Sequence, residues 1–183
     1  SRSEVPGLLD PWGYFFPDVS SVVKNAKPEE VEREIRAQVE LALKMGLKPT
    51  HLDSHMGTLF ANPAFFAAYV KVAREYRLPF FMVDVRNLPP ALAGMLPAEL
   101  VTHLGEGDII LDAFVSAHPQ VKPEEWGAHY AGILKSLKPG VTQLIVHLGY
   151  DDVELQAVTV DHPDFGSAWR QRDFDVITSP EFK

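Results

Sequence analysis

The stretch EEVEREIRAQVELALKMGLKPTHLDSH, residues 29–55, runs from a helix pattern into a strand pattern and indicates the fold class of the chain. Apolar residues recur at helical spacing from Val31 to Ala42, and Gly46 stands where a left-handed cap would end the helix, so a helix is expected over residues 27–46. Residues 49–55 then have the alternation and the length of a short strand. The order of the two patterns predicts one helix–strand unit of an α/β protein.

Helix and strand patterns alternate along the rest of the chain. Further helices are expected over residues 62–77, 97–107, 122–140 and 167–177, and strands over 78–85, 108–115, 142–149 and, as a fifth, 174–178. The strands after the first are nearly continuous apolar runs, which predicts burial on both faces and a parallel sheet with helices packed outside. These strands are too few for an eight-stranded barrel, so an incomplete barrel and a doubly wound sheet both remain open.

Composition narrows the class of protein. A chain of 183 residues that is 46% hydrophobic is expected to form one domain over residues 1–183. The absence of cysteine leaves histidine and carboxylates as metal ligands, and it favours a reducing compartment such as the cytoplasm, although exported proteins also lack cysteine. The net charge of −8 argues against nucleic acid as a partner, and no apolar run is long enough to cross a bilayer. A homodimer is expected only because such folds often pair.

Polar residues follow the predicted strands, at the ends where parallel α/β proteins bind ligands. They are His55 with Asp53, Asp84 with Arg86, Asp112, and His147. In a parallel sheet these residues would converge on one mouth. Arg86, with Asp84 beside it, is a candidate to bind a substrate oxygen, but Asp84 and Asp112 are equally suited to cap the helices that follow them.

The His-Asp-His alternation at residues 51–55 is the candidate metal site. On a strand, His51, Asp53 and His55 project to one face, and at about 3.3 Å per residue the Cα atoms of His51 and His55 lie roughly 13 Å apart. Metal–nitrogen bonds are only about 2.0–2.1 Å long, so His55 is the better ligand, with Asp53 beside it and His51 deeper in a structural role. A buried polar cluster that binds no metal remains the alternative. These ligand types do not decide between Zn²⁺ and Mg²⁺.

PTHLDSH, at residues 49–55, is very similar to the signature of the YdjC-like carbohydrate deacetylases, which act on chitooligosaccharides. Three further segments resemble the family in order and spacing: VPGLLDPWGYFFP (residues 5–17), LIVHLGYDD (144–152) and RQRDFDVITSPEF (170–182). The resemblance therefore covers essentially the whole chain. It implies a distorted, incomplete (β/α) barrel related to polysaccharide deacetylases, and removal of an acetyl group from N-acetylated amino sugars or oligosaccharides.

The resemblance also implies roles for individual residues. In the family one divalent ion, Mg²⁺ or Zn²⁺, is held by an early aspartate, an early histidine and the position of His55, and the position of His147 supplies the general acid. The early ligands have no counterpart in residues 1–50, so we expect the chain to lack the N-terminal strands of its domain and to be active only with them. Met56 after the signature and Leu148 in place of a proline suggest a different substrate pocket.

Three hypotheses about function remain. The first is a metal-dependent hydrolase that deacetylates N-acetylated sugars, for which the aromatic residues near Trp12 or Trp169 are candidates to stack on a sugar ring. The second is a non-catalytic carbohydrate-binding or structural relative, in which the His-Asp-His residues are retained for stability. The third keeps the enzyme but changes the substrate to an acylated, lipid-linked sugar.

Overall fold

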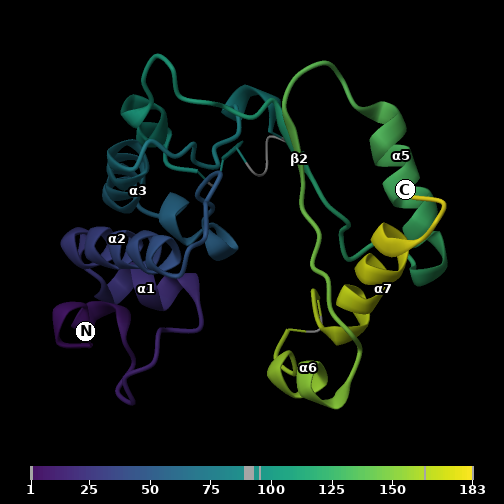
Figure 1. Cartoon of the computed structure of the whole chain (residues 1–183), viewed down its shortest axis with the longest axis horizontal. Helices are drawn as coiled ribbons and strands as arrows, with labels where there is room; N and C mark the ends of the chain where they lie inside the picture. The colour runs from purple at the N-terminus through teal and green to yellow at the C-terminus, as the bar shows by residue number, and fades with distance from the viewer. Residues whose placement is uncertain (1, 89–92, 95, 163, 183) are drawn as a thin grey trace. The chain divides into compact units, whose positions relative to one another are not determined.

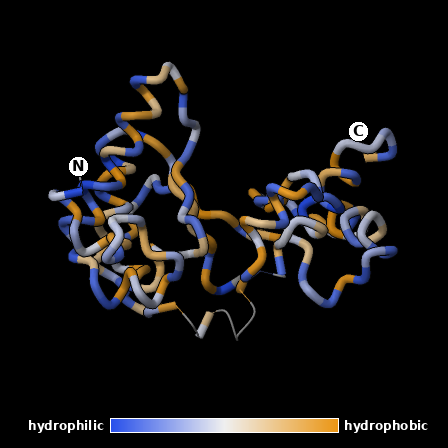
Figure 2. Tube along the Cα trace, turned by 90° about the horizontal axis from the view of Figure 1, so that it is seen from below, coloured by the Kyte–Doolittle hydropathy of each residue, from blue (hydrophilic) through white to orange (hydrophobic). Residues whose placement is uncertain are grey.

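The computed structural model describes residues 2–88, 93–94, 96–162 and 164–182 (Figure 1). The chain divides into two compact units, Ser1–Ile110 and Leu111–Lys183, and each is described by itself. Apolar and hydrophilic stretches alternate along the trace in both units (Figure 2). In the described part of the chain, no helix has the length and apolar character needed to cross a membrane.

The first unit is mainly helical. It contains α1 (Val19–Asn25), α2 (Pro28–Lys44), α3 (Pro63–Glu75) and the 3-10 helices η1 (Arg2–Glu4), η2 (Pro6–Leu8), η3 (His55–Phe60), η4 (Val85–Asn87) and η5 (Ala98–His103). The helices predicted at residues 27–46 and 62–77 are confirmed as α2 and α3, which pack together (Figure 1). Gly46 has φ +81, as a left-handed cap requires, and Asn62 caps α3 by accepting the N–H of Ala64 at 2.8 Å.

A buried glutamate fixes the start of α2. The Glu30 carboxylate accepts the N–H of Lys27 at 2.8 Å and the N–H of Gly7 at 2.9 Å, so it joins η2 to α2. Burial opposes ionisation of Glu30, but the two amide hydrogen bonds outweigh it, and the pKa of Glu30 is lowered. Gly7 has no room for a side chain, because a Cβ there would lie 2.4 Å from Glu30 Oε2.

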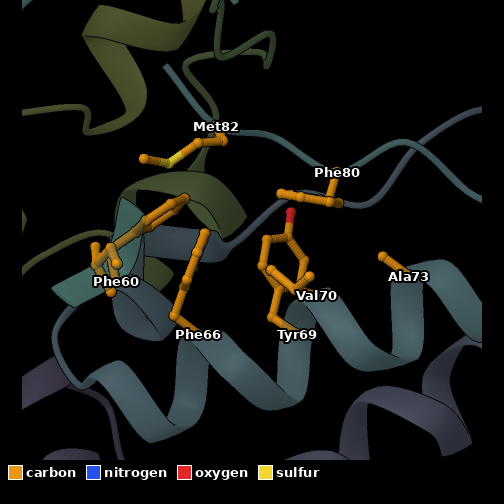
Figure 3. Packing of buried hydrophobic residues seen from close by; sticks show 8 residues of the cluster. Phe60, Phe66, Tyr69, Val70, Ala73, Phe80 and Met82 are labelled. Atoms are coloured by element: carbon orange, nitrogen blue, oxygen red, sulfur yellow. The ribbon is translucent and has the colours of Figure 1, made fainter. Parts of the chain in front are cut away.

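The main core of the first unit lies on one face of α3. Phe66, Tyr69 and Val70 point from α3 towards the segment that carries Phe80 and Met82 (Figure 3). Phe66 meets the ring of Phe80 at 6.2 Å in an edge-on arrangement, and Tyr69 meets it at 5.6 Å. This packing holds residues 78–82 against the buried face of α3.

The two strands predicted in the first unit pair in parallel but are very short. Leu52 and Phe80 form a single parallel bridge, in which the Leu52 N–H donates to the carbonyl of Pro79 at 2.8 Å. The expected strands over residues 49–55 and 78–85 are wrong in length. The physical reason is local: η3 begins at His55, and Asp84 caps η4, so the extended backbone ends on both sides of the bridge.

The second unit combines a small parallel sheet with helices. It contains β1 (Ala113–Val115), η6 (Pro123–Glu125), α5 (Trp126–Ser136), β2 (Thr142–Leu144), α6 (Val153–Val158) and α7 (Ser167–Thr178). The register pairs Ala113 with Thr142 and Val115 with Leu144. The protein is therefore a mixed α/β protein with a small parallel sheet, as the alternating patterns predicted.

Several expectations for the second unit are wrong. The strands expected over residues 108–115 and 142–149 form, but only over β1 and β2. Residues 174–178 belong to α7 and not to a fifth strand, because Trp169 and Asp173, one helical turn apart, are both buried. Asp112 precedes β1 and so lies at the amino end of the strand, not at the carboxyl end. Its Oδ2 accepts the N–H of Val141 at 2.7 Å, which ties the starts of β1 and β2 together.

Candidate functional site

The hydroxyl of Tyr69 holds the main chain of the signature segment, residues 49–55, in place. Its hydroxyl donates to the carbonyl of Leu52 at 2.6 Å and accepts the N–H of Phe81 at 3.1 Å. Burial raises the pKa of Tyr69 well above its usual range, and the nearby charge of Asp53 acts in the same direction. The phenol therefore stays a neutral donor, and it fixes the residue between His51 and Asp53.

The three polar residues of the signature lie on the surface of the unit. His51, Asp53 and His55 are all exposed, so the expectation that His51 lies deeper is wrong, and a buried polar cluster is not what these residues form. His51 Nδ1 lies 3.0 Å from the hydroxyl of Thr50, and Asp53 Oδ1 accepts the N–H of Ser54 at 2.6 Å.

The chain turns sharply directly after the second histidine of the signature. Met56 and Gly57 both have left-handed backbones, with φ +55 and +68. Ser54 supports the turn, because its carbonyl accepts the N–H of Gly57 and its hydroxyl accepts the N–H of Leu59, each at 3.0 Å. The turn ends the extended segment at His55, where the 3-10 helix η3 begins.

A cavity of about 430 Å³ opens beside this turn. Asp53, Ser54 and His55 contribute polar groups to its wall. Another part of the wall comes from α2 and is mostly apolar, with Val31 and Ile35 among its residues. The signature therefore places three polar side chains at the edge of an apolar cavity, an arrangement typical of ligand sites.

The described residues of this site supply only some of the ligands that a divalent ion requires. His55 is exposed, so its imidazole is accessible as one ligand. Within the described ranges, however, no three histidines, aspartates or glutamates gather closely enough to hold a metal. A zinc site takes three or four protein ligands, so these residues do not complete one by themselves.

Asp84 and Arg86 form a local ion pair. Asp84 caps η4 by accepting the N–H of Arg86 at 2.9 Å, which confirms the capping role, and its Oδ2 lies 2.5 Å from Arg86 Nη2. Hydrogen bonds from Arg86 lower the pKa of Asp84, and the same contact raises the pKa of Arg86. Their predicted role in substrate binding stays a prediction.

His147 lies in the second unit, three residues beyond β2. Its imidazole is half-buried and lies 5.1 Å from the ring of Phe165. Phe165 is 37% exposed and has a left-handed backbone with φ +66, which is uncommon for an aromatic residue. Two residues after His147, the N–H of Gly149 donates to the carbonyl of Arg170 in α7 at 3.3 Å.

Sequence reasoning missed Asp173. Asp173 stands among charged residues, a pattern that predicts an exposed helix face, yet its side chain is fully buried. The available signal was its place one turn after Trp169, on the apolar side of α7. Trp169 itself is buried against Trp126, with ring centroids 4.8 Å apart, so the suggestion that it stacks on a sugar is wrong, whereas Trp12 is 77% exposed.

The fold and these sites describe a mixed α/β protein with polar residues at the ends of short parallel strands. Over residues 1–183 the chain matches the YdjC-like protein family and belongs to it. A carbohydrate deacetylase of Thermus thermophilus is 30% identical over 190 residues, which cover 99% of this chain and 64% of that protein. A carbohydrate deacetylase of Geobacillus stearothermophilus is 36% identical over 98% of this chain and 70% of that protein.

One solved structure has the same fold. A protein of Enterococcus faecalis described as a cellobiose-phosphate cleavage protein superimposes with a TM-score of 0.71 at 22% identity. The match covers 100% of this chain and 64% of that protein. The chain thus spans just under two thirds of both the Thermus relative and this structure.

Proposed function

We propose that the whole protein is a carbohydrate deacetylase that hydrolyses the acetamide of N-acetylated amino sugars or oligosaccharides. Two relatives with that name match nearly the whole chain. The structural observation that carries the proposal is the position of Asp53, Ser54 and His55 on the wall of one cavity, directly after Leu52, whose carbonyl accepts the hydroxyl of Tyr69. As the architecture of the whole domain we propose the distorted, incomplete (β/α) barrel, supported by the parallel pairing in each unit.

Amide hydrolysis requires a polarised carbonyl and a proton for the leaving amine. We propose His147 as the general acid, because it follows a parallel strand and its imidazole is only half-buried. We propose His55 as one ligand of a divalent ion, Mg²⁺ or Zn²⁺, with Asp53 orienting it and the other ligands coming from outside the described residues. An ion there would polarise the acetyl carbonyl. Asp84 and Arg86 would bind substrate oxygens.

The test is metal content and deacetylation of a chitooligosaccharide by the intact protein. We expect His55→Ala to lose the ion and the activity while the protein stays folded. We expect His147→Ala to keep the ion and to lose turnover by about 10²–10⁴-fold, the usual contribution of one proton transfer. His162→Ala is the matched control, because His162 is also exposed and has no proposed role. Unchanged metal in His55→Ala, or full turnover in His147→Ala, would contradict the assignments.

A non-catalytic carbohydrate-binding role is the second candidate. It would use the same cavity wall, to which Asp53, Ser54 and His55 contribute polar groups. In that case the intact protein would bind a chitooligosaccharide without turnover, and it would hold no ion even after reconstitution with Zn²⁺ or Mg²⁺. The same pair of measurements therefore separates the two candidates.

A further inference from the structure

Beyond β2, the backbone N–H groups on the side facing β1 still donate hydrogen bonds after β1 has ended. The N–H of Ile145 donates to the carbonyl of Val115, the last residue of β1, at 2.8 Å. Two residues further on, the N–H of His147 donates to Oδ2 of Asp173 at 2.8 Å. Alternate residues of a strand present their amides to the same side. A side-chain carboxylate from α7 therefore takes the place of a β-strand partner at His147.

The same carboxylate is held on its other side by α5. Asp173 Oδ1 accepts the indole N–H of Trp126 at 2.8 Å and the hydroxyl of Tyr130 at 2.6 Å. Burial raises the pKa of Tyr130 well above its usual value, and the hydrogen bond to Asp173 raises it further, so the phenol remains a donor. A buried carboxylate is costly unless hydrogen bonds compensate it, and here three donors do so.

We propose that Asp173 is a positioning residue, whose carboxylate fixes the main chain at His147 and thereby sets where the His147 imidazole lies. The inference rests on the proposed function, in which His147 is the general acid. A misplacement of about 1 Å in a reacting group costs up to about 10²-fold in rate. Only a carboxylate suits this position, because both of its oxygens accept. An asparagine would turn its NH₂ group towards one of the donors and leave that donor unpaired.

The first experiment is Asp173→Asn in the intact protein, assayed with a chitooligosaccharide. We expect kcat to fall by about 10- to 100-fold, because His147 shifts, while KM stays within roughly twofold. Tyr130→Phe is the matched control. It removes one donor to Oδ1 and leaves the bond between Oδ2 and His147 intact, so its kcat should stay close to that of the wild type. A kcat loss in Asp173→Asn no larger than that in Tyr130→Phe would overturn the proposal.

A double-mutant cycle shows whether Asp173 acts through His147. In the His147→Ala background, Asp173→Asn should cause no further loss of kcat, because the group that it positions is already gone. Losses that multiply in full would mean that Asp173 supports the reaction by another route, and they would overturn the proposal.

Amide hydrogen exchange at His147 tests the inference without any activity. We expect slow exchange in the wild type and in Tyr130→Phe, and faster exchange in Asp173→Asn. If the intact protein does not deacetylate sugars, the proposed function fails, and this measurement still decides whether Asp173 fixes the main chain. If Asp173→Asn does not fold, the wild type alone is decisive, since rapid exchange at His147 would overturn the proposal and slow exchange would support it.

Discussion

Replacing Tyr69 with phenylalanine tests how the signature segment is held. The hydroxyl makes two hydrogen bonds, donating to Leu52 at 2.6 Å and accepting from Phe81 at 3.1 Å. The Phe81 N–H also donates to the Leu52 carbonyl directly, at 2.8 Å, so neither backbone group loses its last partner in the variant. The ring, which packs against Phe66 and Phe80, is retained.

The magnitude follows from this arrangement. A hydrogen bond contributes about 0.5–1.5 kcal/mol net, and larger costs arise when a buried group is left unpaired. We therefore expect Tyr69→Phe to lower the free energy of unfolding by about 1 kcal/mol, or roughly 2–4 °C in Tm for a chain of this length. Tyr69→Ala also empties a fully enclosed site and should cost about 3–5 kcal/mol.

The assay is urea denaturation of the intact protein, followed by circular dichroism. Tyr76→Phe is the matched control, because the Tyr76 hydroxyl donates to the exposed carboxylate of Glu40 at 2.9 Å and its loss should cost well under about 1 kcal/mol. A loss above about 3 kcal/mol in Tyr69→Phe would refute the reasoning, because it would mean that a backbone group had been left unpaired. Equal losses in Tyr69→Phe and Tyr76→Phe would refute it as well.

Two further predictions concern backbone geometry and pH. Gly140→Ala should lower the free energy of unfolding by more than about 1 kcal/mol, because the φ of Gly140 is +136 and a Cβ there would lie 2.4 Å from Asp112 Oδ2. Gly132 is the matched control, because it lies within α5 and has open space around it. In the same denaturation assay Gly132→Ala should be neutral or stabilising. Hydrogen bonds from the hydroxyls of Ser20 and Ser21 lower the pKa of Asp18 from 3.8 to about 2. A carboxyl group whose pKa is lowered by folding stabilises the folded state at pH values above its ordinary pKa. The Tm difference between wild type and Asp18→Ala should therefore be complete above pH 3.8 and should vanish as the pH falls towards 2. Equal stability of the two glycine variants, or a Tm difference that does not change with pH, would contradict these predictions.

The two long helices of the first unit, α2 and α3, could be predicted because their signals are local. Pro28 and Gly46 mark the ends of α2, and Asn62 caps α3; each acts within one turn of its helix. The end of the extended segment at His55 was also predictable, because the strand pattern over residues 49–55 stops there.

The strands were harder to predict, because their extent depends on partners that are distant in sequence. The pattern at residues 49–55 and 78–85 indicated strands and a parallel sheet, yet in the described part of the chain these two segments pair through a single bridge, Leu52 with Phe80. The turn at Met56 and the cap at Asp84 end the pairing, and both act against a hydrophobic pattern that would otherwise continue.

The sequence alone determined the main helices α2, α3, α5 and α7, the parallel character of the pairing and the family, because these depend on spacing and on short motifs. Only the tertiary structure decided that Asp173 is buried and bound to the main chain of His147. Its other two donors, Trp126 and Tyr130, lie 47 and 43 residues away, and no local pattern connects them. A carboxylate can be buried only where folding brings enough hydrogen-bond donors to it to offset the loss of water. For Asp173, the packing of α5 against α7 supplies these donors.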